Sequence, residues 1–280
     1  METQFHSILG LPRSGKTTFL AALWHIIDAG EVDTKLILDQ LVGDHRYLNR
    51  IVEAWRRCEE VPRTPVAAET QVAIHVHEPA NGRKIVLEFP DLSGESFEDQ
   101  FAARMCTSAY VEGFARDGGI LLFVNADRPA DGMTHLDLVP AIFGDEAAEN
   151  DDSEQEWSAK LVPEQVRLVE LLQFIQRAPF QIRSRRLALV VSAWDVITDP
   201  GLEPAVWLER EMPFLHQFLR NNRQSFDVRV YGVSAQGGDV TGGERQNLAR
   251  ETPSRRIRCV GPNADPHDLT APIVWLSGGD

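Results

Sequence analysis

The stretch Phe5–Thr18, FHSILGLPRSGKTT, decides the fold expected of this chain. A short apolar run, Phe5–Leu9, leads into residues 10–17, which match the pattern G-x-x-x-x-G-K-[S/T], and an amphipathic stretch follows. Glycines let such a loop wrap an anion with its backbone N–H groups, and the start of a helix adds its positive end. The stretch therefore predicts a strand, a phosphate-binding loop and a helix over Lys16–Ala29.

Within this phosphate loop (residues 10–17), two side chains carry the expected chemistry. Lys16 is expected to contact the β- and γ-phosphates of a nucleotide, and the hydroxyl of Thr17 to bind Mg²⁺. Arg13 stands where small residues are common, so it either extends into solvent or reaches a phosphate as a catalytic residue. The other expected phosphate contacts are Gly10, Ser14, Gly15 and Thr18.

The rest of the chain alternates short apolar runs with longer amphipathic stretches, which is typical of an α/β fold with a largely parallel sheet. Residues 79–82, Pro-Ala-Asn-Gly, join two of the runs as one antiparallel hairpin. We therefore expect a six-stranded, mostly parallel sheet with one antiparallel pair. The expected strands are Phe5–Leu9, Gln71–His77, Lys84–Phe89, Gly119–Val124, Leu187–Val191 and Val228–Val233.

Helices are expected where apolar residues recur at helical spacing behind a capping residue or a proline. Residues 1–280 form one expected domain with insertions at about 31–69 and 128–162 and a closing segment at about 252–280. The expected helices are Lys16–Ala29, Leu38–Cys58, Ser96–Phe114, Pro163–Arg177 and Pro204–Asn221, with a short last one within Asp268–Leu276.

Charge and composition limit the class of protein. The 280 residues include 28 Lys and Arg against 42 Asp and Glu, a formal net charge of −14, which argues against binding nucleic acid through bulk charge. The acidic run at 145–156, DEAAENDDSEQE, is either a solvated loop or a docking surface. Two arginine clusters, Arg183/Arg185/Arg186 and Arg255/Arg256/Arg258, are expected in solvated loops.

The cellular setting is predicted from what the sequence lacks. The three cysteines are far apart without a C-x-x-C pair, which favours a reducing compartment. No run approaches the roughly 20 apolar residues that span a bilayer, so we expect no membrane span and a soluble, cytoplasmic protein.

Two further strand ends carry residues suited to a nucleotide. After the run ending at Phe89, Asp91 is placed to hold magnesium and Gly94 to present its N–H to a γ-phosphate. After Val191, the carboxylate of Asp195 is suited to accept from N1–H and the amine of guanine. The next strand ends at Ser234 and Ala235, where a backbone N–H is suited to donate to the guanine O6.

In this order, GLPRSGKT, DLSGE, SAWD and SA resemble the first, third, fourth and fifth nucleotide motifs of the Ras-like, translation-factor-related GTPases. The resemblance spans residues 5–235. It implies the three-layer sandwich of P-loop nucleoside triphosphatases, with GTP or GDP bound together with Mg²⁺. The long stretch after the first motif, Trp194 and the closing segment further resemble the bacterial double-GTPase domains of conflict and defence systems.

The chain departs from that pattern at three places. Ser192 and Ala193 replace the Asn-Lys of N-K-x-D, which weakens the case for guanine over adenine. Glu95 follows the D-x-x-G motif, where many members carry a water-orienting glutamine, so Glu95 is a candidate catalytic residue. Pro12 and Arg13 occupy loop positions that usually carry small side chains.

The threonine that completes the magnesium shell has no fixed spacing. Thr64, in the non-helical stretch Val61–Pro65, is the first candidate, with Thr70 second and Arg63 as a phosphate contact. An ordinary loop residue is an equally good interpretation of Thr64.

These observations predict a GTP-binding protein that hydrolyses GTP slowly and acts as a conformational switch on a protein partner, either another GTPase or an effector. An ATPase or nucleotide kinase is the alternative if the base site prefers adenine. A non-hydrolysing, nucleotide-dependent scaffold is the alternative if GTP is bound without turnover.

Overall fold

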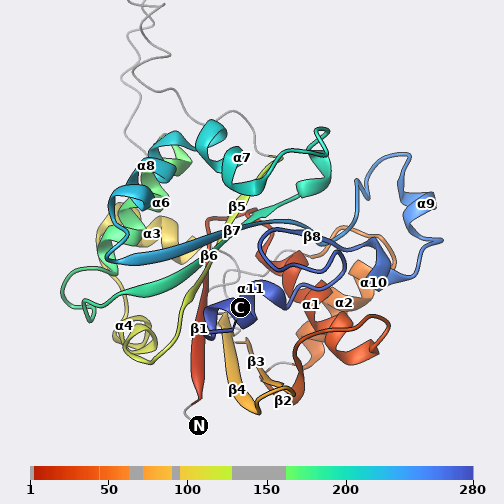
Figure 1. Ribbon diagram of the computed structural model, residues 1–280, viewed down its shortest axis with the longest axis horizontal. Coiled ribbons are helices and arrows are strands. Elements are labelled where there is room, and N and C mark those ends of the chain that lie inside the picture. Colours follow the sequence, from red (N-terminus) through yellow and green to blue (C-terminus); the bar gives the residue numbers. More distant parts are fainter. Residues whose placement is uncertain (1–2, 44, 63–71, 90–94, 128–161, 280) are drawn as a thin grey trace, which may run out of the picture.

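The computed structural model describes residues 3–43, 45–62, 72–89, 95–127 and 162–279, and these form one eight-stranded sheet (Figure 1). Strand β1 (Gln4–Leu9) lies at its centre, parallel to β4 (Arg83–Phe89) on one side and β5 (Ile120–Asn125) on the other. The strand order is β2-β3-β4-β1-β5-β6-β7-β8, where β2 is Ile37–Gly43, β3 Val72–Glu78, β6 Arg185–Ser192, β7 Phe226–Ser234 and β8 Arg258–Val260.

The expected α/β sheet is observed, but it has two strands more than the six predicted. Strand β2 pairs antiparallel with β3, and the short β8 pairs antiparallel with β7, so the described sheet holds three antiparallel pairs instead of one. The run before Asp44 contains Leu and Val at spacings that suit a helix and a strand equally. Pairing with β3 makes it a strand, so the predicted helix Leu38–Cys58 is wrong over its first part, and α2 (His45–Arg56) is the helical remainder.

Alternation along the central strands produces two cores and three layers. Ile8 and Phe123 belong to the core beneath α1 (Lys16–Ala29), α2 and α11 (Ala271–Leu276). Leu9 and Val124 belong to the opposite core. Figure 1 shows the helices of the second core on the other side of the sheet, namely α3 (Glu95–Ala103), α4 (Ser108–Ala115), α6 (Glu164–Phe174), α7 (Pro204–Glu211) and α8 (Pro213–Asn221).

Two predicted helices are each divided in two. The expected Ser96–Phe114 helix breaks at Arg104, which adopts a left-handed φ of 55°, and α4 restarts behind Thr107, whose hydroxyl accepts from the Tyr110 N–H at 3.2 Å. The expected Pro204–Asn221 helix breaks at Met212, because Pro213 lacks an N–H group and restricts the residue before it.

The closing segment binds the central strand from one face. His6 on β1 is fully buried, where its Nδ1 accepts from the Gly119 N–H at 2.9 Å and its Nε2 lies 2.7 Å from the Ser277 hydroxyl. Arg186 on β6 donates to the Trp275 carbonyl at 2.7 Å. Residues 252–279, with α10 (Pro253–Arg256), β8 and α11, therefore complete the sheet and cover one of its faces.

The prediction of solvated loops is wrong for two of the arginines, Arg185 and Arg256. Arg185 is 4% exposed and donates to the Phe114 carbonyl at 3.1 Å, and burial, with the charge of Arg183, lowers its pKa to about 10. Arg256 is 2% exposed and lies over the Trp55 ring. Both donate hydrogen bonds to buried carbonyl groups, a role that a local charge pattern does not reveal.

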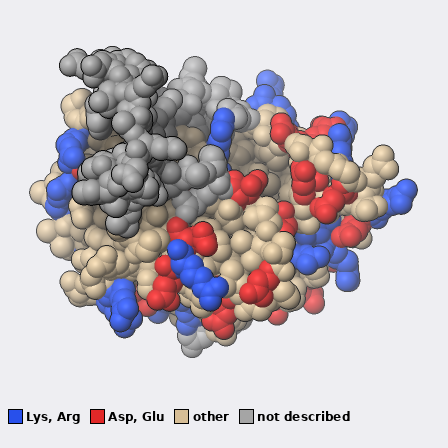
Figure 2. Space-filling model, turned by 90° about the horizontal axis from the view of Figure 1, so that it is seen from above, with Lys and Arg blue, Asp and Glu red and all other residues tan. Residues whose placement is uncertain are grey.

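One face of the molecule shows how the charged side chains are distributed. The face seen in Figure 2 carries Asp and Glu interspersed with Lys and Arg, and no continuous basic stripe crosses its described part. The acidic run 145–156 lies outside the described residues. In the ranges described, every helix is too short or too polar to cross a membrane.

His6 gives the stability of the fold a testable pH dependence. Burial, reinforced by the charge of Arg83, lowers the pKa of His6 from 6.5 to about 3. Between these values the unfolded chain binds a proton that the folded chain does not, so the free energy of unfolding should fall as the pH drops below about 6.5. Urea denaturation at several pH values should show this decline in the wild type and a weaker one in His6→Gln.

The matched control for that series is His216→Gln, which alters a half-buried histidine on α8. It should keep the wild-type pH dependence. Equal slopes in the wild type and His6→Gln would show that His6 is not the group responsible.

Candidate nucleotide-binding site

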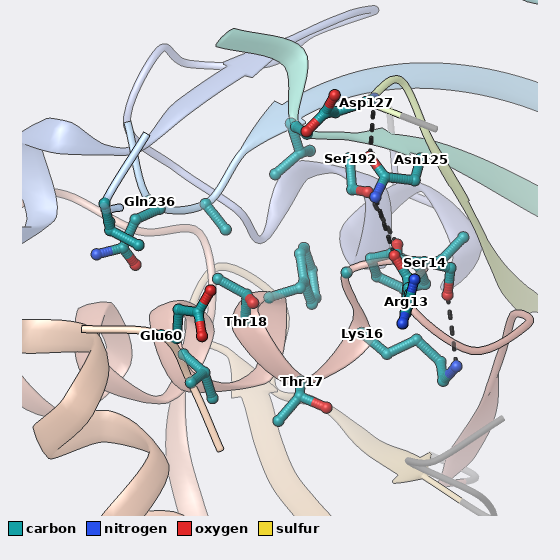
Figure 3. A pocket seen from close by; sticks show the side chains of 18 of the residues that line it. Arg13, Ser14, Lys16, Thr17, Thr18, Glu60, Asn125, Asp127, Ser192 and Gln236 are labelled. Carbon is teal, nitrogen blue, oxygen red and sulfur yellow. Dashed lines mark hydrogen bonds between the residues drawn. The ribbon is translucent and has the colours of Figure 1, made fainter. Parts of the chain in front are cut away.

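The phosphate loop connects the central strand to α1 and is held from behind by the two neighbouring strands. The side-chain amide of Asn125, at the end of β5, donates to the Arg13 carbonyl at 2.9 Å. The hydroxyl of Ser192, at the end of β6, donates to the Ser14 carbonyl at 2.9 Å. Figure 3 shows these contacts on one side of the loop. Because its carbonyls are bound there, the loop keeps a fixed shape.

Gly15 is required by this packing. Its φ of 91° lies in the left-handed region, and a Cβ atom there would lie 2.7 Å from both Cβ and Oγ of Ser192. Any side chain at residue 15 would push the loop away from β6. The second glycine of the motif thus allows the contact with Ser192 as well as the turn into α1.

Lys16 lies inside the loop and is 3% exposed. Its ammonium donates to the carbonyls of Gly10 at 2.6 Å and Leu11 at 3.0 Å, and lies 3.4 Å from the Ser14 hydroxyl. The charge is held at the start of α1, where the helix dipole also favours an anion. A phosphate at this position would meet a fixed cation and a helix N-terminus together.

A pocket of about 620 Å³ opens beside the loop, at the carboxyl ends of the parallel strands. The two cations among its described lining residues, Arg13 and Lys16, both belong to the phosphate loop. Thr17 and Thr18 line the same pocket from the first turn of α1 (Figure 3). The ends of β6 and β7 contribute further lining residues, namely Ser192, Ala193, Asp195, Val233, Ala235 and Gln236.

Asp195 also lines the pocket, in the short 3₁₀ turn Trp194–Val196 that follows β6. The hydroxyl of Ser234, at the end of β7, donates to Asp195 Oδ1 and itself accepts from the Gly237 N–H at 2.9 Å. Ser234 is fully buried, whereas Asp195 is exposed. The serine therefore orients the carboxylate and leaves its second oxygen available to a ligand.

The loop after β7 (residues 234–238, the β7 loop) is bound to the end of α2. The indole N–H of Trp55 donates to the Ala235 carbonyl at 2.8 Å, and the Gln236 amide donates back to the Trp55 carbonyl at 3.1 Å. Arg256 lies 4.9 Å from the centre of the Trp55 ring, donates to the same carbonyl at 3.2 Å and contacts the Cys58 sulfur. Trp55 and Arg256 are both buried, so the backbone of the β7 loop is fixed.

Acidic side chains from outside the phosphate loop also line the pocket. They are Glu59, Glu60, Asp127, Asp195 and Asp239. Hydrogen bonds from the hydroxyl and backbone N–H of Thr241 lower the pKa of Asp239, so it carries its charge at neutral pH. The pocket therefore combines the two cations of the phosphate loop with carboxylates from other segments.

The structure places several predicted site residues together. Arg13, Ser14, Gly15, Lys16, Thr17 and Thr18 line the pocket with Asp195 and Ala235, while Gly10 and Ser234 lie behind it and bind Lys16 and Asp195. Thr64, Thr70, Arg63, Asp91 and Gly94 lie outside the described residues. Glu95 is the first residue of α3.

Four contributors were not predicted as site residues, namely Asn125, Ser192, Glu60 and Gln236. Ser192 counts as a departure from the N-K-x-D pattern in the sequence, yet it binds the phosphate loop. Asn125 directly follows the predicted strand Gly119–Val124, and a polar residue just after a strand is a signal that could have found it. Glu60 and Gln236 follow no motif, since their places depend on long-range packing.

A strand, loop and helix that direct a buried cation and a helix N-terminus into a pocket at the carboxyl edge of a parallel sheet define a P-loop nucleotide-binding protein. The family model of Double-GTPase 1 matches residues 7–276. The chain belongs to this family. It is a GTP-binding protein by family, and its site lies within the matched range.

Solved structures with a similar fold include three GTPase domains. The chain is 12% identical to the S. cerevisiae Ski7 GTPase-like domain bound to GTP (TM-score 0.43), covering 84% of this chain and 43% of that one. It is 11% identical to the T. maritima FeoB G domain (TM-score 0.33), covering 89% and 97%. It is 10% identical to the Trypanosoma brucei Arl6 small GTPase with bound GppNp (TM-score 0.37), covering 90% and 100%. No curated protein matches the chain.

Proposed function

We propose that the chain binds GTP with Mg²⁺ in this pocket, hydrolyses it slowly and acts as a nucleotide-dependent switch on a protein partner. One observation carries the proposal: the phosphate loop and Asp195, whose carboxylate is held by the Ser234 hydroxyl, line the same pocket. A guanine nucleotide has the matching polarity, with anionic phosphates at one end and N1–H and amine donors at the other.

The residues present suit a magnesium ion that is bound mainly by the nucleotide. Thr17 supplies a hydroxyl oxygen beside the phosphate end of the pocket. Among the described residues, no group of three acidic, histidine or cysteine side chains is arranged to hold a metal. Mg²⁺ is commonly bound by one or two carboxylates plus phosphate oxygens and water. We propose Thr17, Asp91 and Thr64 as its protein ligands, and the ion would neutralise charge on the phosphates.

Catalysis is proposed to depend on Lys16, Arg13, Glu95 and Thr64. Lys16 supports this role through its fixed ammonium, and Arg13 lines the same pocket from the neighbouring part of the loop. Glu95 would orient the attacking water, while Gly94 would donate its N–H to the γ-phosphate. A carboxylate near the phosphates accepts a proton from water but also repels the transferred group, so hydrolysis should be slow.

The base is proposed to bind Asp195 through N1–H and its amine, with the Ala235 N–H donating to O6. The fixed β7 loop supports this assignment, because Trp55 holds the Ala235 carbonyl and Ser234 holds the Asp195 carboxylate. Adenine lacks the two donors at these positions. GTP should therefore bind more tightly than ATP although Ala193 replaces the usual lysine.

The biological setting is proposed from the family alone. A switch needs a partner, which would be another GTPase or an effector, and a bacterial defence system in the cytoplasm is the setting implied by the double-GTPase resemblance. The identity of the co-purifying nucleotide separates the alternatives. Guanosine diphosphate would support a GTPase, and an adenine nucleotide would support an ATPase or nucleotide kinase. Bound GTP that is never turned over would support a scaffold.

Lys16→Ala should abolish tight binding of Mg²⁺–GTP, because the variant removes the buried cation of the phosphate loop and leaves backbone dipoles and the exposed Arg13. Calorimetry at fixed magnesium measures the loss. The control is Lys84→Ala, which alters an exposed lysine of β4 that pairs with Asp39 of β2 and does not line the pocket. It should bind like the wild type. Equal affinity in Lys16→Ala and the control would overturn the assignment.

Asp195→Asn should weaken GTP and improve XTP relative to it, because the amide offers a donor to the 2-carbonyl of xanthine. Losing the charged acceptor should weaken GTP by about 2 to 5 kcal/mol. Competition binding of GTP, XTP and ATP to both proteins measures this. A wild type that prefers ATP, or an unchanged GTP-to-XTP ratio, would remove Asp195 from the base site.

Turnover by the isolated chain should stay well below about 10 per second, a typical enzyme median. Arg13→Ala should lower kcat by about tenfold or more if its guanidinium stabilises the transferred phosphoryl group. Single-turnover hydrolysis of saturating GTP measures this, with Arg220→Ala, an exposed residue of α8, as the control. Fast hydrolysis that neither Arg13→Ala nor Glu95→Ala changes would contradict the proposed catalytic roles.

A further inference from the structure

Glu60 is an acidic side chain directed into a pocket whose proposed ligand is an anion. It follows α2 by four residues and lines the pocket (Figure 3). Figure 3 shows its carboxylate pointing toward Thr18 on α1. A carboxylate in this place repels phosphate, so it would favour a part of the nucleotide that offers neutral hydrogen-bond donors.

The position of Glu60 is set by the turn that ends α2. Cys58 is fully buried and adopts a left-handed φ of 53°, and its N–H donates to the Trp55 carbonyl at 3.1 Å. The next N–H, of Glu59, donates to the Ala54 carbonyl at 2.9 Å. This turn is fixed by the same Trp55 that binds the β7 loop, so Glu60 is held relative to the pocket.

The two neighbouring glutamates differ in their partners. Glu59 forms an ion pair with Arg245 at 3.5 Å. Glu60 is exposed and, within the part of the chain that the structure describes, has no hydrogen bond or ion pair. Its carboxylate therefore serves no evident structural purpose and has both oxygens available to a ligand.

The place of Glu60 along the pocket indicates which part of a nucleotide it meets. In Figure 3, Thr18 and Glu60 lie between Lys16 on one side and Gln236 of the β7 loop on the other. Phosphates belong at Lys16 and the base belongs beside Asp195 and Ala235. The sugar connects these two ends, and Glu60 is an acidic residue that lines the pocket between Lys16 and Gln236 in this view.

We propose that Glu60 recognises the ribose by accepting hydrogen bonds from its 2′- and 3′-hydroxyls. The inference rests on the proposed nucleotide site and names a specificity-determining residue within it. Ribose offers two adjacent neutral donors, which suit the two oxygens of one carboxylate. A sugar without these hydroxyls would leave Glu60 facing the nucleotide without a donor.

The test compares GTP with 2′,3′-dideoxy-GTP by competition binding at fixed magnesium. The wild type should favour GTP by about tenfold or more, as expected for hydrogen bonds to a charged group. In Glu60→Gln the ratio should shrink, and in Glu60→Ala it should approach one. Taking the ratio cancels any general gain in affinity from removing a negative charge near the phosphates.

Glu53→Gln is the matched control, since it removes an exposed carboxylate of α2 that pairs with Arg57 and does not line the pocket, and it should keep the wild-type ratio. Equal binding of both nucleotides by the wild type, or an unchanged ratio in Glu60→Ala, would overturn the inference while leaving the proposed function intact. If ATP binds better than GTP, the proposed base site fails, and ATP against 2′,3′-dideoxy-ATP decides the role of Glu60 by the same ratio. Failure to bind any nucleotide would overturn both.

Discussion

A loop that binds an anion through its N–H groups must direct its carbonyls elsewhere, and the rest of this structure depends on how that is done. The carbonyls of Arg13 and Ser14 accept from Asn125 and Ser192, and those of Gly10 and Leu11 accept from Lys16. Strands β5 and β6 must end beside β1 for these contacts to form. The central order of the sheet is therefore also the condition for a phosphate site.

The other end of the pocket depends on contacts between distant parts of the chain. Trp55 on α2 holds the β7 loop, and Arg256 on α10 holds the end of α2. Burial lowers the pKa of Arg256, while the nearby Cys58 sulfur and the charge of Glu251 act against that shift. The base end, the segment with Glu60 and the closing segment therefore form one connected structure.

Much of this architecture could be predicted from local sequence, because the phosphate loop, Lys16–Ala29 and the six apolar runs each carry a pattern that does not depend on distant residues. The errors have one physical cause. Residues 37–43 become a strand because they pair with β3. Arg256 is buried because its guanidinium packs on the Trp55 ring and contacts the Cys58 sulfur. The role of Ser192 was hidden for the same reason, since its partner Ser14 is 178 positions away in sequence.

The contact between His6 and Ser277 joins residues 271 positions apart. During synthesis it can form only after the last segment has left the ribosome. At about 5 to 20 residues per second, α11 emerges roughly 15 to 50 seconds after the central strand. Until then one apolar face of β5 and β6 lacks its cover. The nascent chain thus exposes an apolar, aggregation-prone surface to which chaperones could bind during this interval. Slow synthesis of the last segment would lengthen that exposure.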